Sequence, residues 1–195
     1  MGNFSKKGTG FSLVELLLVI TIIGLLASIV LINLNNAREH AKVVEATATA
    51  RTLTSSIALY RNDMGFFPPE VDKGWDPGLV EPFPNNPDTG KTNRNVDCDH
   101  CPKNWQNIVR NNWDGPYLGK WPQFTPWLGK YDYNYWGSWT TRYGCYVSAG
   151  IYVGVQRDYD DENPITPLAE QIMVNKGYDA DSCINGEAQL VLFFL

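Results

Sequence analysis

Cysteine and histidine are the side chains best suited to metal or redox chemistry. This chain has 4 cysteines and 2 histidines. Cys98 and Cys101 are separated by two residues, one of which is His100. This spacing is typical of half a zinc site, of a redox pair or of a local disulfide. A structural zinc ion usually needs four ligands, and the remaining candidates are isolated in the sequence: Cys145, Cys183 and His40. We therefore favour a local Cys98–Cys101 disulfide over a metal site.

Two acidic segments offer the oxygen ligands that calcium prefers. Their members are Asp158, Asp160, Asp161 and Glu162 in the first, and Asp179, Asp181, Asn185 and Glu187 in the second. Calcium takes about six to eight oxygens, so either segment could contribute ligands. Neither segment has the EF-hand form, because the glycine that its turn requires is missing. Calcium binding is one interpretation of these segments, and solvated acidic loops are the other.

The sequence indicates neither catalysis nor nucleic-acid binding. Catalysis would need a nucleophile–base pair or a metal site, but the two histidines occur in unrelated contexts, without a glycine-rich phosphate loop or a nucleophile elbow. The net charge is -5. A nucleic-acid binder needs clustered Lys and Arg to displace counterions, and no such cluster is present. We expect a protein that is not an enzyme and has no nucleic-acid partner.

Glu15 is the single ionisable residue between Gly8 and Leu34, in a run that is almost wholly apolar over residues 11–34. As a helix this run would be about 36 Å long, enough to cross a hydrocarbon core of about 30 Å. It is too long for the apolar part of a secretory signal, so we expect a membrane anchor. A carboxylate in lipid is costly unless it has a partner. Because the next charged residue along the helix is Arg38, that partner would be an amino group of another chain, unless the carboxyl is protonated in a shallow position.

The orientation of this anchor follows from charges and cysteines. Lys6 and Lys7 lie on its short N-terminal side, so the positive-inside rule places the N-terminus in the cytoplasm. All the cysteines lie beyond it, and their even number fits an oxidising compartment. We expect a single-pass protein of the cytoplasmic membrane with an extracytoplasmic head.

The chain becomes amphipathic after the anchor, from Asn35 to Tyr60. Apolar residues recur there at helical spacing: Ala37, Ala41, Val44, Ala48, Leu53, Ile57 and Tyr60. No Gly or Pro interrupts the chain between Leu25 and Met64, which predicts one helix of about 50 residues. Gly65 suits a left-handed C-terminal cap.

Residues 65–195 are expected to form a β-rich head. Residues 70–104 have the composition of a long loop, whereas alternating tyrosines predict a strand over 131–135. A second strand is expected over 145–155 and a last one over 188–195. The predicted fold class is α+β, with a long N-terminal helix packed on a small antiparallel sheet.

The N-terminal pattern resembles the leader and helix start of type IV prepilins. It consists of Lys6-Lys7, then Gly10-Phe11-Ser12-Leu13-Val14-Glu15-Leu16, then an unbroken apolar helix. In that family a peptidase cuts after the glycine, and the new N-terminus is methylated. The resemblance implies cleavage between Gly10 and Phe11 and N-methylation of Phe11. It also implies that Glu15 pairs with the N-terminal ammonium of a neighbouring subunit during assembly.

The head carries a second resemblance, to the major pseudopilin of type II secretion. The matching segments are Trp113-Asp114-Gly115-Pro116-Tyr117-Leu118 and Thr125-Pro126-Trp127-Leu128-Gly129-Lys130-Tyr131-Asp132-Tyr133. Thr125 replaces a usual aspartate, and Leu128 is inserted before the glycine. Disulfides clamp the C-terminal segment in many pilin heads, which implies a Cys145–Cys183 pair.

Major pseudopilins also hold calcium after a Ser-x-Gly-x-Asp-Gly segment. This chain keeps Ser148 and Gly150 but has Tyr152 where the aspartate is usual. The candidate calcium ligands are therefore the acidic residues of the two later segments: Asp158, Asp160, Asp161, Asp179, Asp181 and Glu187.

Together the resemblances imply a leader at 1–10, a transmembrane assembly helix at 11–34, its amphipathic continuation at 35–64 and a head at 65–195. They imply a structural subunit of a pilus-like filament, the pseudopilus that drives export in type II secretion. A type IV pilin for adhesion, motility or DNA uptake is the alternative. The implied partners are copies of the chain in a helical filament, a prepilin peptidase and methyltransferase, an inner-membrane assembly platform with minor pilins, and lipid before assembly. The filament would lie in the periplasm or at the cell surface.

Overall fold

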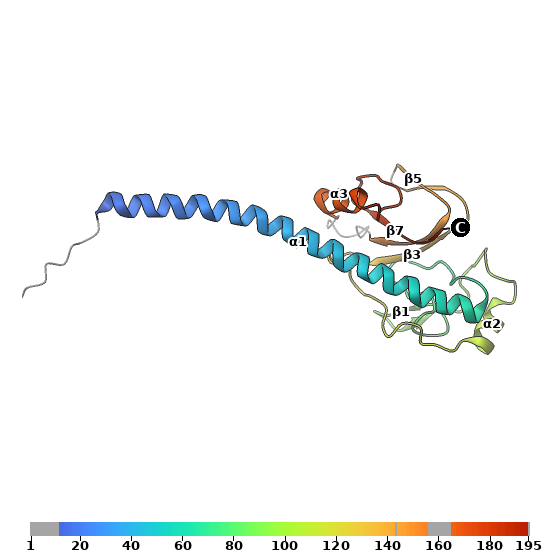
Figure 1. Ribbon diagram of the computed structural model, residues 1–195. Coiled ribbons are helices and arrows are strands. Elements are labelled where there is room, and N and C mark those ends of the chain that lie inside the picture. Colours follow the sequence, from blue (N-terminus) through green and yellow to red (C-terminus); the bar gives the residue numbers. More distant parts are fainter. Residues whose placement is uncertain (1–11, 143, 156–164, 195) are drawn as a thin grey trace, which may run out of the picture. The chain divides into compact units, whose positions relative to one another are not determined.

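The computed structural model describes residues 12–142, 144–155 and 165–194 (Figure 1). Its elements are α1 (Leu13–Met64), β1 (Asn85–Asn86), β2 (Lys91–Thr92), α2 (Trp105–Asn112), β3 (Tyr131–Trp136), β4 (Thr140–Arg142), β5 (Cys145–Val147), β6 (Gly150–Val155), α3 (Pro167–Asn175) and β7 (Ala188–Phe194). The chain divides into two compact units, Met1–Arg38 and Glu39–Leu195. The long helix and the small antiparallel sheets confirm the α+β class.

The described part of the first unit is helical from Leu13 onward. Its large apolar side chains are exposed, from Leu13 at 84% to Leu34 at 43%. By length and composition α1 is able to cross a membrane, since an 18-residue window reaches a mean hydropathy of 2.8. Exposed apolar surface of this extent needs lipid or other protein to cover it.

In the second unit, α1 buries a stripe at three- and four-residue steps: Val43, Ala46, Ala50, Leu53, Ile57, Tyr60 and Met64. The expected stripe was wrong in its first half, because Ala41 and Ala48 are exposed and Val44 is 59% exposed. The helix carries two neighbouring rows of small apolar residues here, and periodicity alone does not say which row the sheet contacts. Gly65 ends the helix as predicted, with φ of 80° and its amide 2.8 Å from the Arg61 carbonyl.

The main sheet has the strand order β3-β6-β7, with both pairs antiparallel. Tyr133 of β3 lies opposite Val153 of β6, which lies opposite Leu190 of β7. All three side chains are buried in one cluster with Leu53 and Ile57 of α1. This face of the sheet therefore packs on the helix, whose later turns run alongside it in Figure 1.

The alternate residues of the same strands build the other face. Asp132 and Gln189 flank Gly154 in register, and both polar side chains are buried. The sheet thus separates an apolar core from a buried polar layer. On this second face, the Gln189 side chain donates a hydrogen bond to Glu187.

Several elements differ from expectation. The predicted strand over 145–155 is two strands, because β5 pairs with β4 in a separate hairpin and only β6 joins the main sheet. The expected loop 70–104 contains the short β1–β2 pair. Helices α2 and α3 were not predicted, although α3 has a readable start: Thr166 accepts a 3.3 Å hydrogen bond from the Ala169 amide, with Pro167 as the first helical residue.

Candidate functional site

The start of α1 is capped by two local hydrogen bonds. The Ser12 amide donates to Oε2 of Glu15 over 2.9 Å, and the Val14 amide donates to Oγ of Ser12 over 3.3 Å. A serine followed three residues later by glutamate is the sequence signature of a capping box, which our sequence analysis missed. The carboxylate of Glu15 therefore points back to the N-terminal end of its own helix.

Part of the predicted site lies outside the described residues. This holds for Gly10 and Phe11 at the expected cleavage point, and for Asp158, Asp160 and Asp161 of the first acidic segment. The second acidic segment and both pairs of cysteines are described.

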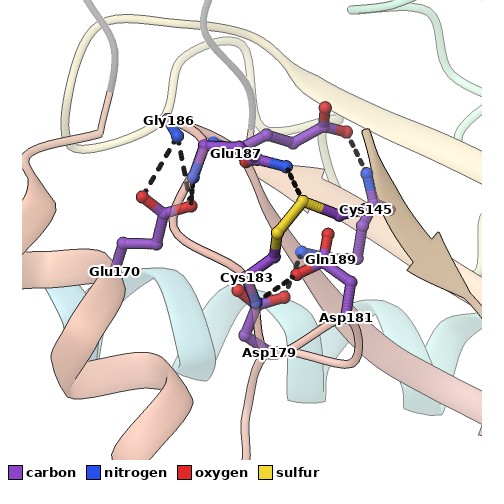
Figure 2. Close-up of a disulfide and its surroundings, with 9 residues drawn as sticks. Cys145, Glu170, Asp179, Asp181, Cys183, Gly186, Glu187 and Gln189 are labelled. Carbon is purple, nitrogen blue, oxygen red and sulfur yellow. Dashed lines mark hydrogen bonds between the residues drawn. A yellow bond between two sulfur atoms is a disulfide. The ribbon is translucent and has the colours of Figure 1, made fainter. Parts of the chain in front are cut away.

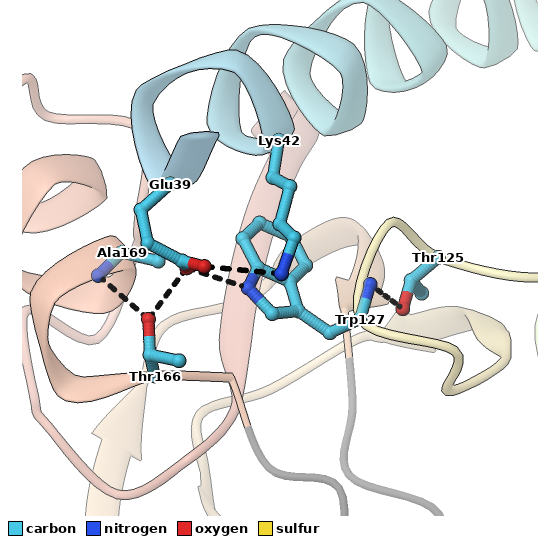
Figure 3. A network of polar contacts seen from close by, with 6 residues as sticks. All are labelled: Glu39, Lys42, Thr125, Trp127, Thr166 and Ala169. Carbon is cyan, nitrogen blue, oxygen red and sulfur yellow. Dashed lines mark hydrogen bonds and ion pairs between the residues drawn. The ribbon is translucent and has the colours of Figure 1, made fainter. Parts of the chain in front are cut away.

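Glu39 joins two parts of the head, the 125–129 segment and the start of α3, to α1 (Figure 3). Its carboxylate accepts hydrogen bonds from Trp127 Nε1 over 2.9 Å and Thr166 Oγ1 over 2.6 Å, and it forms a 3.0 Å ion pair with Lys42. Burial raises the pKa of Glu39, but the bonds from Thr166, Trp127 and Lys42 outweigh it and leave the pKa below its usual value. Periodicity of the apolar residues alone does not predict that Glu39 faces the head. The tryptophan of the predicted pseudopilin pattern is its partner.

The first segment of the pseudopilin pattern, residues 113–118, also contacts α1. Tyr117 donates a 2.8 Å hydrogen bond from its hydroxyl to Oδ2 of Asp63, and its carbonyl accepts one of 2.8 Å from Ser56 Oγ. Trp113 donates from Nε1 to the Gly78 carbonyl over 3.1 Å. These aromatic residues hold the connecting segments of the head against the helix.

The second acidic segment forms a buried cluster with α3 (Figure 2). Glu170 of α3 is fully buried and accepts from the amides of Asn185 at 2.8 Å and Gly186 at 3.1 Å. Asp179 accepts at Oδ1 from the Gln189 amide over 3.0 Å, and Asp181 accepts from the Cys183 amide over 2.9 Å. The cluster is completed by Glu187, which accepts a hydrogen bond from the Gln189 side-chain amide. Glu170 and Gln189 were missed because they lie on a helix and a strand with no acidic motif.

Two aspartates of this cluster, Asp179 and Asp181, each keep one buried oxygen with no hydrogen-bond partner among the described residues, and so does Gln189. The Asp179 side chain is only 3% exposed. Burial, followed by the charge of Asp181, raises the pKa of Asp179 to about 7, and burial also raises the pKa values of Asp181 and Glu170. Unpartnered carboxylate oxygens in a buried acidic cluster suit a cation with oxygen ligands.

The oxygens of this cluster are nevertheless spread out. A compact metal site needs at least three ligand atoms close together. Among the described His, Cys, Asp and Glu side chains, only Cys98, His100 and Cys101 have their ligand atoms within 4.8 Å of one another. Asp179 and Asp181 therefore offer two carboxylate ligands and not a closed set, and Glu187 does not complete a compact group with them.

Both disulfides have the expected pairing. Cys98 is joined to Cys101, and Cys145 of β5 is joined to Cys183. The second bridge links the β4–β5 hairpin to the segment that carries Asp181 and Glu187. The disulfide therefore supports the loop that forms the acidic cluster.

The comparisons with known proteins agree with this architecture. Residues 5–31 match the family model of the prokaryotic N-terminal methylation motif. The chain is 30% identical over 128 residues to the type II secretion system core protein G of Pseudomonas aeruginosa, covering 66% of this chain and 74% of that protein. It is 28% identical over 128 residues to the protein of the same name from Vibrio cholerae, covering 66% and 71%. No solved structure matches.

A methylation motif on an exposed apolar helix, joined to a small α+β head, defines the class of type IV pilin-like proteins. Within that class, the chain belongs to the pseudopilin family, whose members include the type II secretion system core protein G. It is a structural protein and not an enzyme. Family membership and the motif imply a membrane-anchored subunit that is processed at its N-terminus and assembles into a filament.

Proposed function

We propose that the chain is a subunit of the pseudopilus of a type II secretion system and polymerises through its N-terminal helix to drive protein export. The observation that carries the proposal is the start of α1, where Glu15 caps a helix whose large apolar side chains are exposed. In a filament, neighbouring subunits would cover that apolar surface. The names of both curated relatives favour the secretion system over the alternative, a type IV pilin.

Processing would create the partner that Glu15 lacks within its own apolar segment. Cleavage between Gly10 and Phe11 leaves an ammonium group on Phe11, which methylation keeps positively charged. Two opposite charges attract strongly where the effective dielectric constant is low, and removal of one leaves the other uncompensated. We propose that Glu15 of one subunit binds the Phe11 amine of the next and sets the axial register between them.

Processing is tested by co-expression with a prepilin peptidase, followed by mass spectrometry of the N-terminus. We expect cleavage after Gly10 and a methylated Phe11. An intact N-terminus, or cleavage elsewhere, would contradict the assignment.

Assembly is tested with Glu15→Gln, because glutamine can keep the capping hydrogen bond to Ser12 while the negative charge is lost. We expect normal cleavage but strongly reduced filament formation. Glu45→Gln, at an exposed position of the same helix, is the matched control and should assemble normally. If Glu15→Gln assembles like the control, charge pairing at Glu15 is not required.

The orientation follows the same proposal, with the N-terminus in the cytoplasm and the head in the periplasm. Accessibility of the head to protease in spheroplasts, but not in intact cells, is the expected result for the secretion role. A strain that lacks its core pseudopilin does not export a reporter protein. Restoration of that export by this chain would support the secretion role. Long surface pili without restored export would favour the type IV pilin.

We further propose that the acidic cluster binds calcium, with Asp179 and Asp181 as ligands. The support is their unpartnered buried oxygens and the raised pKa of Asp179. Calcium, but not the same concentration of magnesium, should raise the unfolding temperature of the full chain in detergent. Asp179→Asn should remove this response and exposed Asp72→Asn should keep it; an unchanged response in Asp179→Asn would contradict the site.

A further inference from the structure

The segment Cys98–Cys101 brings two sulfurs and an imidazole together on the surface of the head. Cys98 Sγ lies 3.6 Å from Nδ1 and 3.4 Å from Nε2 of His100. The three ligand atoms of Cys98, His100 and Cys101 all lie within 4.8 Å of one another. At the second disulfide, Cys145–Cys183, the described residues form no group of this kind.

His100 is held in a fixed orientation by the segment that follows α1 and by the sheet. Its Nε2 lies 3.1 Å from the Phe67 carbonyl oxygen and 3.0 Å from that of Pro68, and its ring stacks on Tyr135 with centroids 3.5 Å apart. A carbonyl only accepts, so Nε2 carries the proton and Nδ1 keeps its lone pair. A histidine that binds a metal characteristically donates its other ring N–H to a carbonyl or carboxylate in this way.

The three ligand atoms of this group, two sulfurs and an imidazole nitrogen, suit a tetrahedral metal ion. Zinc lies about 2.3 Å from a thiolate sulfur and about 2.0 Å from an imidazole nitrogen. Sulfur and nitrogen ligands of such an ion are therefore roughly 3.5 Å apart. In the disulfide state Cys98 Sγ lies nearer to Nε2 than to Nδ1, so the released Cys98 side chain has to turn toward Nδ1 to share an ion with it. The bonded sulfurs cannot both act as thiolates, so metal binding requires the disulfide to open.

We propose that Cys98, His100 and Cys101 form a binding site for zinc or a similar thiophilic cation when the Cys98–Cys101 disulfide is reduced. A dithiol supplies two electrons and two protons, the S–S bond breaks, two cysteine thiols form and the dithiol becomes a disulfide. Metal binding then releases the two thiol protons to solvent. Oxidation by a disulfide reverses the exchange and expels the metal. The segment thus has two exclusive states, a disulfide and a metal site.

The surroundings favour a cation in the reduced state. His100 and Cys98 line an open cavity of about 490 Å³ together with Glu70, Asp97 and Asp99. Acidic groups attract a cation, and carboxylate oxygen is an accepted zinc ligand. Three protein ligands with an open side leave room for one of these oxygens or water as the fourth.

Cobalt is the direct probe, because its thiolate complexes absorb visible light. The full chain, purified in detergent without a histidine tag, is reduced with a phosphine and titrated with Co²⁺ and then Zn²⁺. We expect one ion per chain with a sulfur-to-cobalt absorption band, displaced by zinc and absent from the oxidised protein. His100→Ala should weaken binding at least tenfold, and Cys98→Ala/Cys101→Ala should abolish it.

The matched control is Cys145→Ala/Cys183→Ala, which removes the other disulfide and should keep the band. Equal cobalt binding by the oxidised chain, or loss of the band only in the control, would overturn the proposal. A second measurement does not depend on the variants. Zinc, but not magnesium, should slow re-formation of the Cys98–Cys101 disulfide, followed by alkylation and mass spectrometry. An unchanged rate would also overturn the proposal.

Discussion

Trp127 donates a 2.9 Å hydrogen bond from its indole nitrogen to Oε2 of Glu39, which lies 88 residues earlier in the chain. The same oxygen accepts a 2.6 Å hydrogen bond from Thr166, the N-cap residue of α3. One carboxylate oxygen of α1 therefore holds both the 125–129 segment and the start of a second helix. Trp127, which belongs to the pseudopilin pattern, therefore has a structural role.

We expect Glu39→Ala to destabilise the head by about 1–3 kcal/mol, because the buried Trp127 N–H and the Thr166 hydroxyl lose their acceptor. Glu45→Ala, at an exposed site of α1, should change stability by less than about 0.5 kcal/mol. The readout is tryptophan fluorescence during denaturation of the full chain in detergent, since all 7 tryptophans lie beyond α1. Equal stability of the two variants would show that the contact does not matter.

The pH dependence of this contact has a defined sign. The folded-state pKa of Glu39 is lowered, so its contribution is present above the unfolded-state pKa and disappears as the pH falls through the folded-state value. The difference in stability between the native chain and Glu39→Ala should therefore narrow in acid.

Asp179 should have the opposite pH dependence. Its folded-state pKa is raised from 3.8 to about 7, so ionisation costs stability progressively between these values, and the full cost applies above them. In a chelator, Asp179→Asn should be more stable than the native chain at pH 8, by on the order of 2–4 kcal/mol. The two should converge near pH 4. A difference independent of pH would mean that the Asp179 charge is compensated.

The two disulfides should contribute unequally to stability. Cys145 and Cys183 are separated by 38 positions, whereas Cys98 and Cys101 are separated by 3. From loop-closure entropy, loss of the longer bridge should cost roughly 4 kcal/mol and loss of the shorter one roughly 2 kcal/mol. Paired Cys→Ala variants, unfolded in denaturant under the same conditions, give the comparison. The reverse order would indicate that the short bridge holds structure beyond its own loop.

The parts of the fold that the sequence predicted correctly were those marked by a long apolar pattern, a regular alternation of residue types or a clear helix cap. The helix boundary near Gly65 and the strand around Tyr133 followed from a cap and from alternation. The two strands within 145–155 did not, because the chain turns at Ser148–Ala149 without a strong turn signal. Helix α3 was overlooked although Thr166 and Pro167 mark its start.

For the candidate sites, local patterns were informative and distant partners were not. Glu15 could be identified from its apolar surroundings, and its capping bond to Ser12 follows from spacing alone. Glu170 and Gln189 could not be assigned to the acidic cluster, because they meet Asp179 and Asp181 only through the placement of α3 and β7. Glu39 likewise depends on Trp127 and Thr166, whose proximity is a property of the fold.

The corrected buried stripe of α1 gives a last prediction, which separates two faces of one helix. Leu53 is 1% exposed and lies in the core with Tyr133, whereas Val44 is 59% exposed. Leu53→Ala should cost about 2–5 kcal/mol, because it leaves a cavity between α1 and the sheet. Val44→Ala should change head stability by less than about 0.5 kcal/mol. If Val44→Ala were as costly as Leu53→Ala, the helix would have to present the row of Ala41, Val44 and Ala48 to the head. That result would contradict the burial of the stripe that contains Leu53.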